Sequence, residues 1–437
     1  GSSLGGIHIE DSNPVISNCT INGNAGNGGI KIDGSSPSII NCDISANSTN
    51  LQGGGIYLKN SNAYIDGCTI GNNAAFAGGG GIAVDENSLP LIINSNISGN
   101  SANQNGGGIE SQISCTPTIL NCVINDNIAD GYGGGIYIGD QYSVIKGCTI
   151  KGNYSAAEGG GIYFREYFET ISYCTIAENE ALSLGGGIIF HASFAGIQNC
   201  TFYSNNCING SGDAVEVWDS GSIIIKNTIF AGHHSHAAIH QYGTPVSLNY
   251  CDFYDNPAGN YAGSPAIPGF EELTMVNLNG DSCDCYMNIF ENPLFIDPQN
   301  LDFHLSNNSP CIDAGDPLSL PDPDGTVADI GAYYFDQSVL IEELISPLPP
   351  QKFFFHPPYP NPFNSSAVIS FELRHAGFVR VAVYDVTGKE LLVLSEGYLP
   401  EGIYRTVFDG SDIASGVYFA RLQAGESSLI QKILLIK

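Results

Sequence analysis

Positive charge is scarce in this chain. The 437 residues include 14 Lys and Arg against 44 Asp and Glu, which gives a formal net charge of -30 at pH 7. Surfaces that bind nucleic acid or anionic lipid need clustered Lys and Arg, so this balance argues against both classes of partner. It favours divalent cations or a solvated extracellular surface instead.

Long apolar runs are also missing. No stretch reaches the roughly 20 apolar residues that cross a membrane as a helix, and the sequence starts with neither an initiator Met nor a signal peptide. We therefore expect no transmembrane segment, and an N-terminus that was processed or trimmed. The patterns of a nucleophile elbow, a phosphate-binding loop and a zinc site are absent from the sequence too.

A repeat of about 26 residues fills the first half of the chain. One aliphatic position recurs after a Gly-rich turn, at Ile7, Ile30, Ile56, Ile82, Ile109, Ile136, Ile162, Ile188, Val215 and Ile239. Apolar residues alternate from each of these positions onward, which indicates short strands rather than helices. The repeat predicts a solenoid in which each copy is one coil.

A second series marks where each coil bends: Cys19, Cys42, Cys68, Ser95, Cys122, Cys148, Cys174, Cys200, Asn227 and Cys251. Three residues earlier there is always Ile or Leu, as in Ile224 before Asn227. The residue just before the series is mostly Asn or Gly, and both tolerate a left-handed backbone. We therefore expect a one-residue corner there, with inward side chains on both of its sides.

Asparagine recurs five residues after this second series, except at Gly232. The positions are Asn24, Asn47, Asn73, Asn100, Asn127, Asn153, Asn179, Asn205 and Asn256. If coils stack at the inter-strand spacing of about 4.8 Å, these amides form a hydrogen-bonded ladder along a corner.

Cysteine is abundant, at 13 residues, but eight of them belong to the inward series. We expect those eight to be buried free thiols, because stacked inward side chains rarely reach the torsion of a disulfide. The better disulfide candidates lie off the series, at Cys115, Cys207, Cys283, Cys285 and Cys311.

Coils of 23 to 27 residues with three short strands and an asparagine corner resemble the right-handed parallel β-helix family. The likeness covers residues 1–251 and implies an all-β fold with about ten coils. The family includes pectate-lyase-like enzymes and many bacterial surface proteins, so the resemblance does not by itself name an activity.

Residues 252–336 lose the period and resemble the distal segment that often closes bacterial β-helix repeat proteins. Asp322-Pro-Asp324-Gly, with Asp329 close by, is half of a calcium-loop pattern. The alternative is ordinary Asp-Pro and Asp-Gly turn chemistry. Calcium is therefore the one cofactor that the sequence suggests.

The chain ends in a separate domain. Residues 337–358 are punctuated by proline and are typical of a linker, whereas residues 359–437 alternate strictly between Gly-rich turns and predict a small antiparallel β-sandwich. The stretches YPNPFN, YDVTGKE and ASGVYFARL resemble the C-terminal sorting domain of type IX secretion substrates. The resemblance implies the type IX machinery as a partner and display on the surface of an outer-membrane-bearing bacterium.

Candidate binding residues lie on the first strand of each coil. The middle residue of this strand should face outward, which defines an outer stripe of His8, Lys31, Tyr57, Ala83, Glu110, Tyr137, Tyr163, Ile189, Glu216 and His240. Aromatic side chains on a flat sheet suit stacking against sugar rings, so Tyr57, Tyr137 and Tyr163 are candidate glycan contacts, with Trp218 nearby.

Candidate catalytic residues follow two positions further along these strands. Arg165 and His191 occupy equivalent places on successive coils, as does Trp218. With Asp140 and Glu166 as a carboxylate pair, Arg165 or His191 would be the base of a polysaccharide lyase or glycoside hydrolase. His233, His234, His236 and His240 are expected to be solvated turn residues rather than a metal site.

We expect a secreted structural or adhesive protein that acts by contact, with the enzyme as the alternative. The expected partners are an extracellular glycan and a second copy of the chain. The first coil has no cap before it, so its strand edges would pair head to tail with another copy and build filaments.

Overall fold

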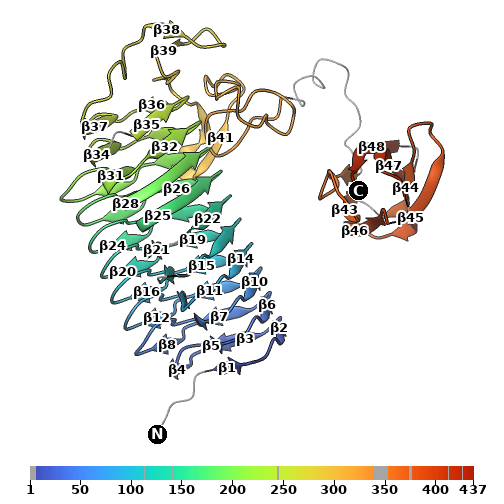
Figure 1. The fold of residues 1–437 in the computed structure, drawn as a ribbon, viewed down its shortest axis with the longest axis horizontal. Coiled ribbons are helices and arrows are strands. Elements are labelled where there is room, and N and C mark those ends of the chain that lie inside the picture. The colour runs from blue at the N-terminus through green and yellow to red at the C-terminus, as the bar shows by residue number, and fades with distance from the viewer. Residues whose placement is uncertain are drawn as a thin grey trace. The chain divides into compact units, whose positions relative to one another are not determined.

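The structure is a computed structural model of all 437 residues. It describes residues 6–112, 114–139, 142–243, 246–337, 353–373, 376–411, 413–425 and 427–437. The chain divides into two compact units, Gly1–Gln337 and Ser338–Lys437. Figure 1 shows that the first unit is a stack of coils whose strands line up in columns.

Each coil contributes a first strand to a parallel ladder, in which equivalent residues pair from one coil to the next. The strands are β1 (Ile7–Glu10), β5 (Ile30–Asp33), β9 (Ile56–Lys59), β13 (Ile82–Asp85), β17 (Ile109–Ser111), β21 (Ile136–Ile138), β25 (Ile162–Ser172), β28 (Ile188–Gln198), β31 (Val215–Ser220), β34 (Ile239–Gly243) and β37 (Tyr261–Ser264). A register shift in this ladder lies between Trp218 and Ser220, where β31 pairs with β34.

A second ladder adjoins the first, and β25 and β28 run through both. Its other strands are β2 (Val15–Ser17), β6 (Ser38–Ile40), β10 (Tyr64–Asp66), β14 (Leu91–Ile93), β18 (Thr118–Leu120), β22 (Ser143–Lys146), β32 (Ile223–Lys226) and β35 (Val246–Asn249).

Two further parallel sheets complete the wall of the solenoid. The ten-stranded one contains β3 (Thr20–Asn22), β7 (Asp43–Ser45), β11 (Thr69–Gly71), β15 (Asn96–Ser98), β19 (Val123–Asn125), β23 (Thr149–Lys151), β26 (Thr175–Ala177), β29 (Thr201–Tyr203), β33 (Ile229–Ala231) and β36 (Asp252–Tyr254). The eight-stranded one contains β4 (Ala25–Gly26), β8 (Ser48–Thr49), β12 (Ala74–Ala75), β16 (Ser101–Ala102), β20 (Ile128–Ala129), β24 (Tyr154–Ser155), β27 (Glu180–Ala181) and β30 (Asn206–Cys207).

The corner between the second and third strands has the left-handed backbone that the sequence predicts. Asn41 has φ 52°, Asn94 49°, Asn121 52° and Gly147 65°. Isoleucines before and after the corner both point inward, since Ile39 and Ile44 are fully buried. Cys42 and Cys122 are also buried, and each thiol donates to the carbonyl oxygen two residues earlier, at 3.3 Å.

In one coil the predicted register is wrong by a single residue. Thr201 on β29 pairs with Ile229, so the partner of Cys200 is Thr228, and Asn227 is the corner residue with φ 49°. Accordingly Ile225 is fully buried, whereas Ile224 is 48% exposed. An extra residue between Cys200 and Thr228 hides this shift, because several aliphatic residues in a row fit either register.

The asparagines form a continuous hydrogen-bonded ladder. From Asn24 to Asn205, each side-chain Nδ2 donates to Oδ1 of the asparagine on the next coil, at 2.8 to 3.0 Å. Each Oδ1 also accepts the backbone N–H of the preceding member, as Asn153 does from Asn127 at 3.0 Å. The second Nδ2 hydrogen is donated to a backbone carbonyl, as from Asn127 to Ile97 O at 2.9 Å, so a buried asparagine of the stack uses both donors and both acceptor positions of its amide.

His233 continues this ladder where the sequence predicted a break at Gly232. Its Nδ1 lies 3.0 Å from Asn256 Oδ1 and its Nε2 lies 3.5 Å from Asn205 Nδ2, so the ring links the two amides. Burial lowers the pKa of His233 to about 4, which keeps the imidazole neutral. His233 is therefore not a solvated turn residue.

The distal segment covers one end and one flank of the solenoid. Phe270 and Phe290 pack on Phe253 of the last complete coil, with ring centroids 5.4 and 5.8 Å away. Further along, Asp316 N donates to Asn227 Oδ1 at 2.8 Å, and Lys226 pairs with the Asp316 carboxylate at 3.2 Å. The elements here are β38 (Met275–Val276), β39 (Ser282–Cys283), β40 (Phe295–Asp297), η1 (Pro298–Asn300) and β41 (Asp302–Leu305).

The second unit is a sandwich of two antiparallel sheets with the orders β42-β43-β46 and β45-β44-β47-β48. Phe353 and Phe355 of β42 are buried in its core, so the sheet begins inside the range 337–358 that the sequence predicted as a linker. The strands are β42 (Phe353–Phe355), β43 (Ser366–Leu373), β44 (Gly377–Tyr384), β45 (Glu390–Leu399), β46 (Gly402–Asp409), β47 (Gly416–Ala424) and β48 (Ser427–Leu435).

None of the thirteen cysteines, all of which lie in described residues, forms a disulfide. The disulfide expectation for Cys207, Cys283, Cys285 and Cys311 is therefore wrong; Cys207, for example, is buried and donates its thiol to Ser183 O at 2.7 Å. Among the described residues there is no helix long and apolar enough to cross a membrane.

Candidate functional site on the outer face of the first strands

The turn that leads into each first strand decides what the outer stripe exposes. In six consecutive coils, eight residues connect the ladder asparagine to the next first strand; the first of these turns is 48–55 and the last is 180–187. The turn after them, 206–214, has nine residues. We call these the long turns. Only five residues make the same connection at 25–29 and 234–238, which we call the short turns.

The long turns fold back directly over the strand that follows them. A Cβ on Gly53 would lie 2.7 Å from the Tyr57 Cβ, and a Cβ on Gly79 would lie 2.6 Å from the Ala83 Cβ. Both glycines also have positive φ, so no other residue fits at this contact without strain. The Gly-rich start of each repeat is therefore the place where a turn touches the sheet.

Because of this cover, the outer stripe is buried in the central coils. The exposed fractions are Ala83 1%, Glu110 1%, Tyr137 7%, Tyr163 6%, Ile189 0% and Glu216 0%. The prediction that the whole stripe faces solvent is wrong. Alternation along a strand places a side chain on one side of the sheet, but it does not tell whether a turn lies above it.

Tyr137 and Tyr163 are consequently not open sugar contacts. Their rings stack with centroids 5.4 Å apart, and Tyr132 from a long turn lies 4.7 Å from the Tyr163 ring. Ile189 and Leu184 complete this small apolar cluster. The two tyrosines stabilise the cover over the strands rather than presenting a surface.

Two carboxylates are buried under the same cover. Glu110 accepts a hydrogen bond from Gln112 Nε2 at 2.8 Å, while its Oε2 has no partner among the described residues. Burial, with a smaller contribution from Asp85, raises the pKa of Glu110 to about 8. Glu216 instead lies 2.9 Å from His240 Nδ1, and this contact raises the pKa of His240.

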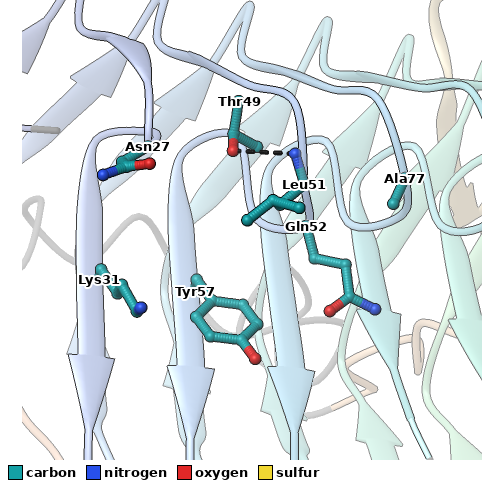
Figure 2. Close-up of a pocket in the computed structure, with 7 residues that line it drawn as sticks. All are labelled: Asn27, Lys31, Thr49, Leu51, Gln52, Tyr57 and Ala77. Carbon is teal, nitrogen blue, oxygen red and sulfur yellow. Dashed lines mark hydrogen bonds between the residues drawn. The ribbon is translucent and has the colours of Figure 1, made fainter. Parts of the chain in front are cut away.

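Tyr57 lies where the row of long turns begins, and it borders a pocket of about 250 Å³. Its hydroxyl donates to Asp85 Oδ2 at 2.9 Å, which fixes the ring, and Lys31 Nζ lies 6.0 Å from the ring centroid. Figure 2 shows the lining, which comprises Asn27, Lys31, Thr49, Leu51, Gln52, Tyr57 and Ala77. The sequence reasoning missed this pocket; the short turn 25–29 was the signal that could have found it.

Trp218 belongs to an open row on the same sheet, beyond the reach of the turns. Register pairs Arg165 of β25 with His191 of β28, His191 with Trp218 of β31, and Trp218 with Tyr242 of β34. We call these four residues the aromatic row. The Trp218 and Tyr242 rings stack with centroids 4.9 Å apart, and the side chains remain 37% and 57% exposed.

The catalytic expectation receives little geometric support. Asp140, the proposed carboxylate partner of Glu166, lies outside the described residues. Arg165 and Glu166 are exposed and make a loose ion pair of 3.7 Å. The hydroxyl of Tyr137 raises the pKa of Arg165 further, which disfavours this guanidinium as a proton acceptor.

His191 has a buried Nδ1 without a hydrogen-bond partner among the described residues. A general base normally has a partner that fixes its tautomer, and the described part of the chain supplies none for His191 Nδ1. His234 lies near Asp255 at 3.7 Å and His236 near Asp213 at 3.3 Å, so the histidines point to separate carboxylates. In the described part of the chain no three His, Cys, Asp or Glu side chains converge as metal ligands do.

The calcium candidates are occupied by turn hydrogen bonds. Asp322 Oδ2 accepts Asp329 N at 2.8 Å, and the two Asp329 oxygens accept Asp313 N and Phe335 N at 2.8 and 2.6 Å. Asp324 accepts the N–H and the hydroxyl of Thr326. Burial raises the pKa of Asp322 to about 6 and that of Asp329 to about 7. This geometry favours turn chemistry over calcium.

Comparison with known protein families covers both units. The family model described as the right-handed β-helix region matches residues 1–109 and 54–230. The model described as the secretion system C-terminal sorting domain matches residues 358–437. No curated protein matches the chain.

Proposed function

The chain belongs to the right-handed β-helix family and carries a type IX sorting domain that directs it to the cell surface or extracellular space; from this premise we propose that it acts there by contact, binding an extracellular glycan along the aromatic row. The proposal concerns the row of Arg165, His191, Trp218 and Tyr242. Self-assembly into filaments stays a prediction, which electron microscopy of the protein at micromolar concentration tests.

The exposed Trp218–Tyr242 stack is the observation that supports this function. Beyond Tyr242 the next strand, β37, presents Ser264, a small exposed residue, and among the described residues Trp218 is the ring that stacks on Tyr242. An aromatic face with an open side suits the apolar face of a pyranose. An exposed aromatic pair on a soluble surface is otherwise unfavourable, which supports a binding role.

The rest of the row supplies hydrogen-bond donors in line with the rings. Neighbouring strands lie about 4.8 Å apart, so the four side chains present one contact group per strand along the solenoid. Arg165 presents a planar guanidinium, which hydrogen-bonds hydroxyl and carboxylate oxygens without changing its protonation state. An extended saccharide chain laid along the solenoid would meet these groups in succession.

Affinity electrophoresis in gels that contain neutral or acidic polysaccharides tests the proposal. We expect at least one polysaccharide to retard the protein, and Trp218→Ala and Tyr242→Ala each to weaken binding about tenfold, which corresponds to the loss of one aromatic contact of about 1.4 kcal/mol. Phe76→Ala is the matched control, because Phe76 is an exposed aromatic residue, 62% accessible, on a turn away from the row. Retardation that persists in the double variant would reject the aromatic row.

The lyase or hydrolase alternative has its own readout in the same samples. Release of new reducing ends from a retarding polysaccharide, lost in Glu166→Gln or Arg165→Ala, would replace the contact function with catalysis. Retardation without release is the outcome that the proposal expects.

A further inference from the structure

The pocket beside Tyr57 results from a difference in turn length. Lys31 follows the short turn 25–29, so no turn folds over it as Gly53 folds over Tyr57 and Gly79 over Ala83. The first long turn, 48–55, therefore has no long turn next to it on the side of Lys31, and its Leu51 is 68% exposed. Figure 2 shows Lys31 and Tyr57 on neighbouring strands, with Asn27, Leu51 and Gln52 from the turns around them.

Three polar side chains of the lining make no side-chain hydrogen bond or ion pair within the described residues, although Lys31 lies over the Tyr57 ring. The amides of Asn27 and Gln52 make no side-chain hydrogen bond there, and Lys31 makes no ion pair. By contrast, Lys59 pairs with Glu86 at 3.2 Å, and Lys226 pairs with Asp316 at 3.2 Å. The Lys31 ammonium group therefore lies beside the Tyr57 ring and between two amides with its hydrogen-bonding capacity available to a ligand.

The apolar part of the lining is held in place. The Tyr57 hydroxyl is bonded to Asp85, and Thr49 Oγ1 donates to Gly26 O at 3.1 Å and accepts Leu51 N at 3.1 Å. The Tyr57 ring, Leu51 and Ala77 therefore offer a preformed apolar surface, which reduces the entropy lost on binding.

The charge around the pocket disfavours anions. Burial raises the pKa of Tyr57, and the carboxylates of Asp85, Glu86 and Asp33 raise it further, so the ring lies in a negative potential. Lys31 is the only charged side chain in the lining. A ligand that carried a carboxylate or sulfate would gain one contact with Lys31 but be repelled by the surrounding acidic residues.

We propose that this pocket binds one uncharged sugar ring, with the ring carbons against Tyr57 and Leu51 and the hydroxyl or acetamido groups bonded to Asn27, Gln52 and Lys31. Side-chain amides both donate and accept, as sugar hydroxyls do, so they complement each other. The pocket is smaller than the roughly 300–1,000 Å³ of sites for drug-sized ligands, which suits a single ring, such as the end of a glycan chain. The inference builds on the proposed glycan contact but rests on different residues.

Titration of the intact protein with neutral methyl glycosides tests it, using methyl glucoside, galactoside, mannoside and the N-acetylglucosamine glycoside, with glucuronate for comparison. Saturation-transfer NMR reports contact and calorimetry reports affinity. We expect millimolar binding of at least one neutral glycoside, and a weakening of about tenfold in Tyr57→Ala and Gln52→Ala. Tyr57→Phe keeps the ring and should retain most of the affinity.

Two controls separate the pocket from general effects. Lys146→Gln removes another lysine next to a tyrosine, since Lys146 Nζ lies 5.2 Å from the Tyr173 ring centroid, and should leave binding unchanged, whereas Lys31→Gln should weaken it. Insertion of three residues into 25–29, which gives this turn the length of the long turns, should close the pocket without altering any lining side chain.

The outcomes are distinguishable. Absence of neutral glycoside binding, preference for glucuronate, or binding that survives Tyr57→Ala with Gln52→Ala overturns the inference. Trp218→Ala should weaken polysaccharide retardation but not monosaccharide binding. Loss of both in Trp218→Ala would show that the pocket is not a separate site, whereas retardation without monosaccharide binding leaves the proposed function intact.

Discussion

The outer face of the first strands has two kinds of region that share one sequence pattern. In the central coils the long turns cover the outer stripe, and Tyr163 is 6% exposed. At the two ends the short turns leave Lys31 and His240 half-buried, with room for the pocket beside Lys31. A difference of three residues in a turn thus decides whether one repeat position is core or surface.

The comparison separates residues that stabilise the solenoid from those that are available for contact. Covered aromatic residues fill space between a turn and a sheet, so their removal leaves a cavity. Open aromatic residues keep much of their surface in water and contribute little to folding. The following predictions test this division, starting with the largest expected change in the free energy of unfolding.

Tyr163→Ala should lower the free energy of unfolding by about 3–5 kcal/mol, because it removes a buried ring from a packed cluster. Urea denaturation of the intact protein, followed by hydrogen exchange of the β25 and β28 amides, measures the loss. A change below about 1 kcal/mol would mean that the long turns do not seal the stripe.

Glu110 should make stability depend on pH. Its folded pKa of about 8 lies above the ordinary value of 4.5, so the folded state binds more protons than the unfolded state between these two values. Stability should therefore fall by about 4 kcal/mol as pH rises from about 4.5 to about 8, and stay level below that range. Glu110→Gln should abolish this fall, whereas Glu178→Gln should not, because Glu178 is an exposed carboxyl at the bend between β26 and β27. Parallel curves for the wild type and Glu110→Gln would contradict the burial of a carboxyl under the turn.

Asn127→Ala should cost about 1–3 kcal/mol, since it leaves buried partners on both adjacent coils unpaired. Asn103→Ala, an exposed asparagine on a long turn, is the matched control for denaturant unfolding. His233→Asn should lose less stability than His233→Ala, because an amide restores the ladder. Equal losses in Asn127→Ala and Asn103→Ala would indicate that the ladder is not buried in solution.

Trp218→Ala and Tyr242→Ala should change the free energy of unfolding by no more than about 1 kcal/mol each, the size of one aromatic pair contact. Thermal unfolding of these variants alongside Tyr163→Ala tests the division directly. A loss comparable to that of Tyr163→Ala would place the aromatic row in the core and remove it as a binding surface.

Much of the architecture was predictable from sequence because it depends on short-range patterns. The residue before each Cys position adopts a left-handed backbone, which Asn and Gly tolerate better than other residues, so Asn41 and Asn121 indicated the corners. The regular spacing of Asn73, Asn100 and Asn127 indicated the ladder, since stacked coils bring equal positions together. Where one residue was inserted, between Cys200 and Thr228, the pattern remained ambiguous and His233 was missed.

The sequence by itself determined the period of the coils, the corners, the sorting domain at the C-terminus and the burial of seven of the eight thiols of the inward series. The eighth, Cys19 on the first coil, is exposed. Only the tertiary structure decided which residues of the outer stripe reach solvent. Alternation fixes the side of the sheet on which Tyr57, Tyr137 and Tyr163 lie, but exposure depends on a turn that folds back from outside the strand. That contact is set by turn length and by glycines such as Gly79 and Gly53 that let two backbones approach.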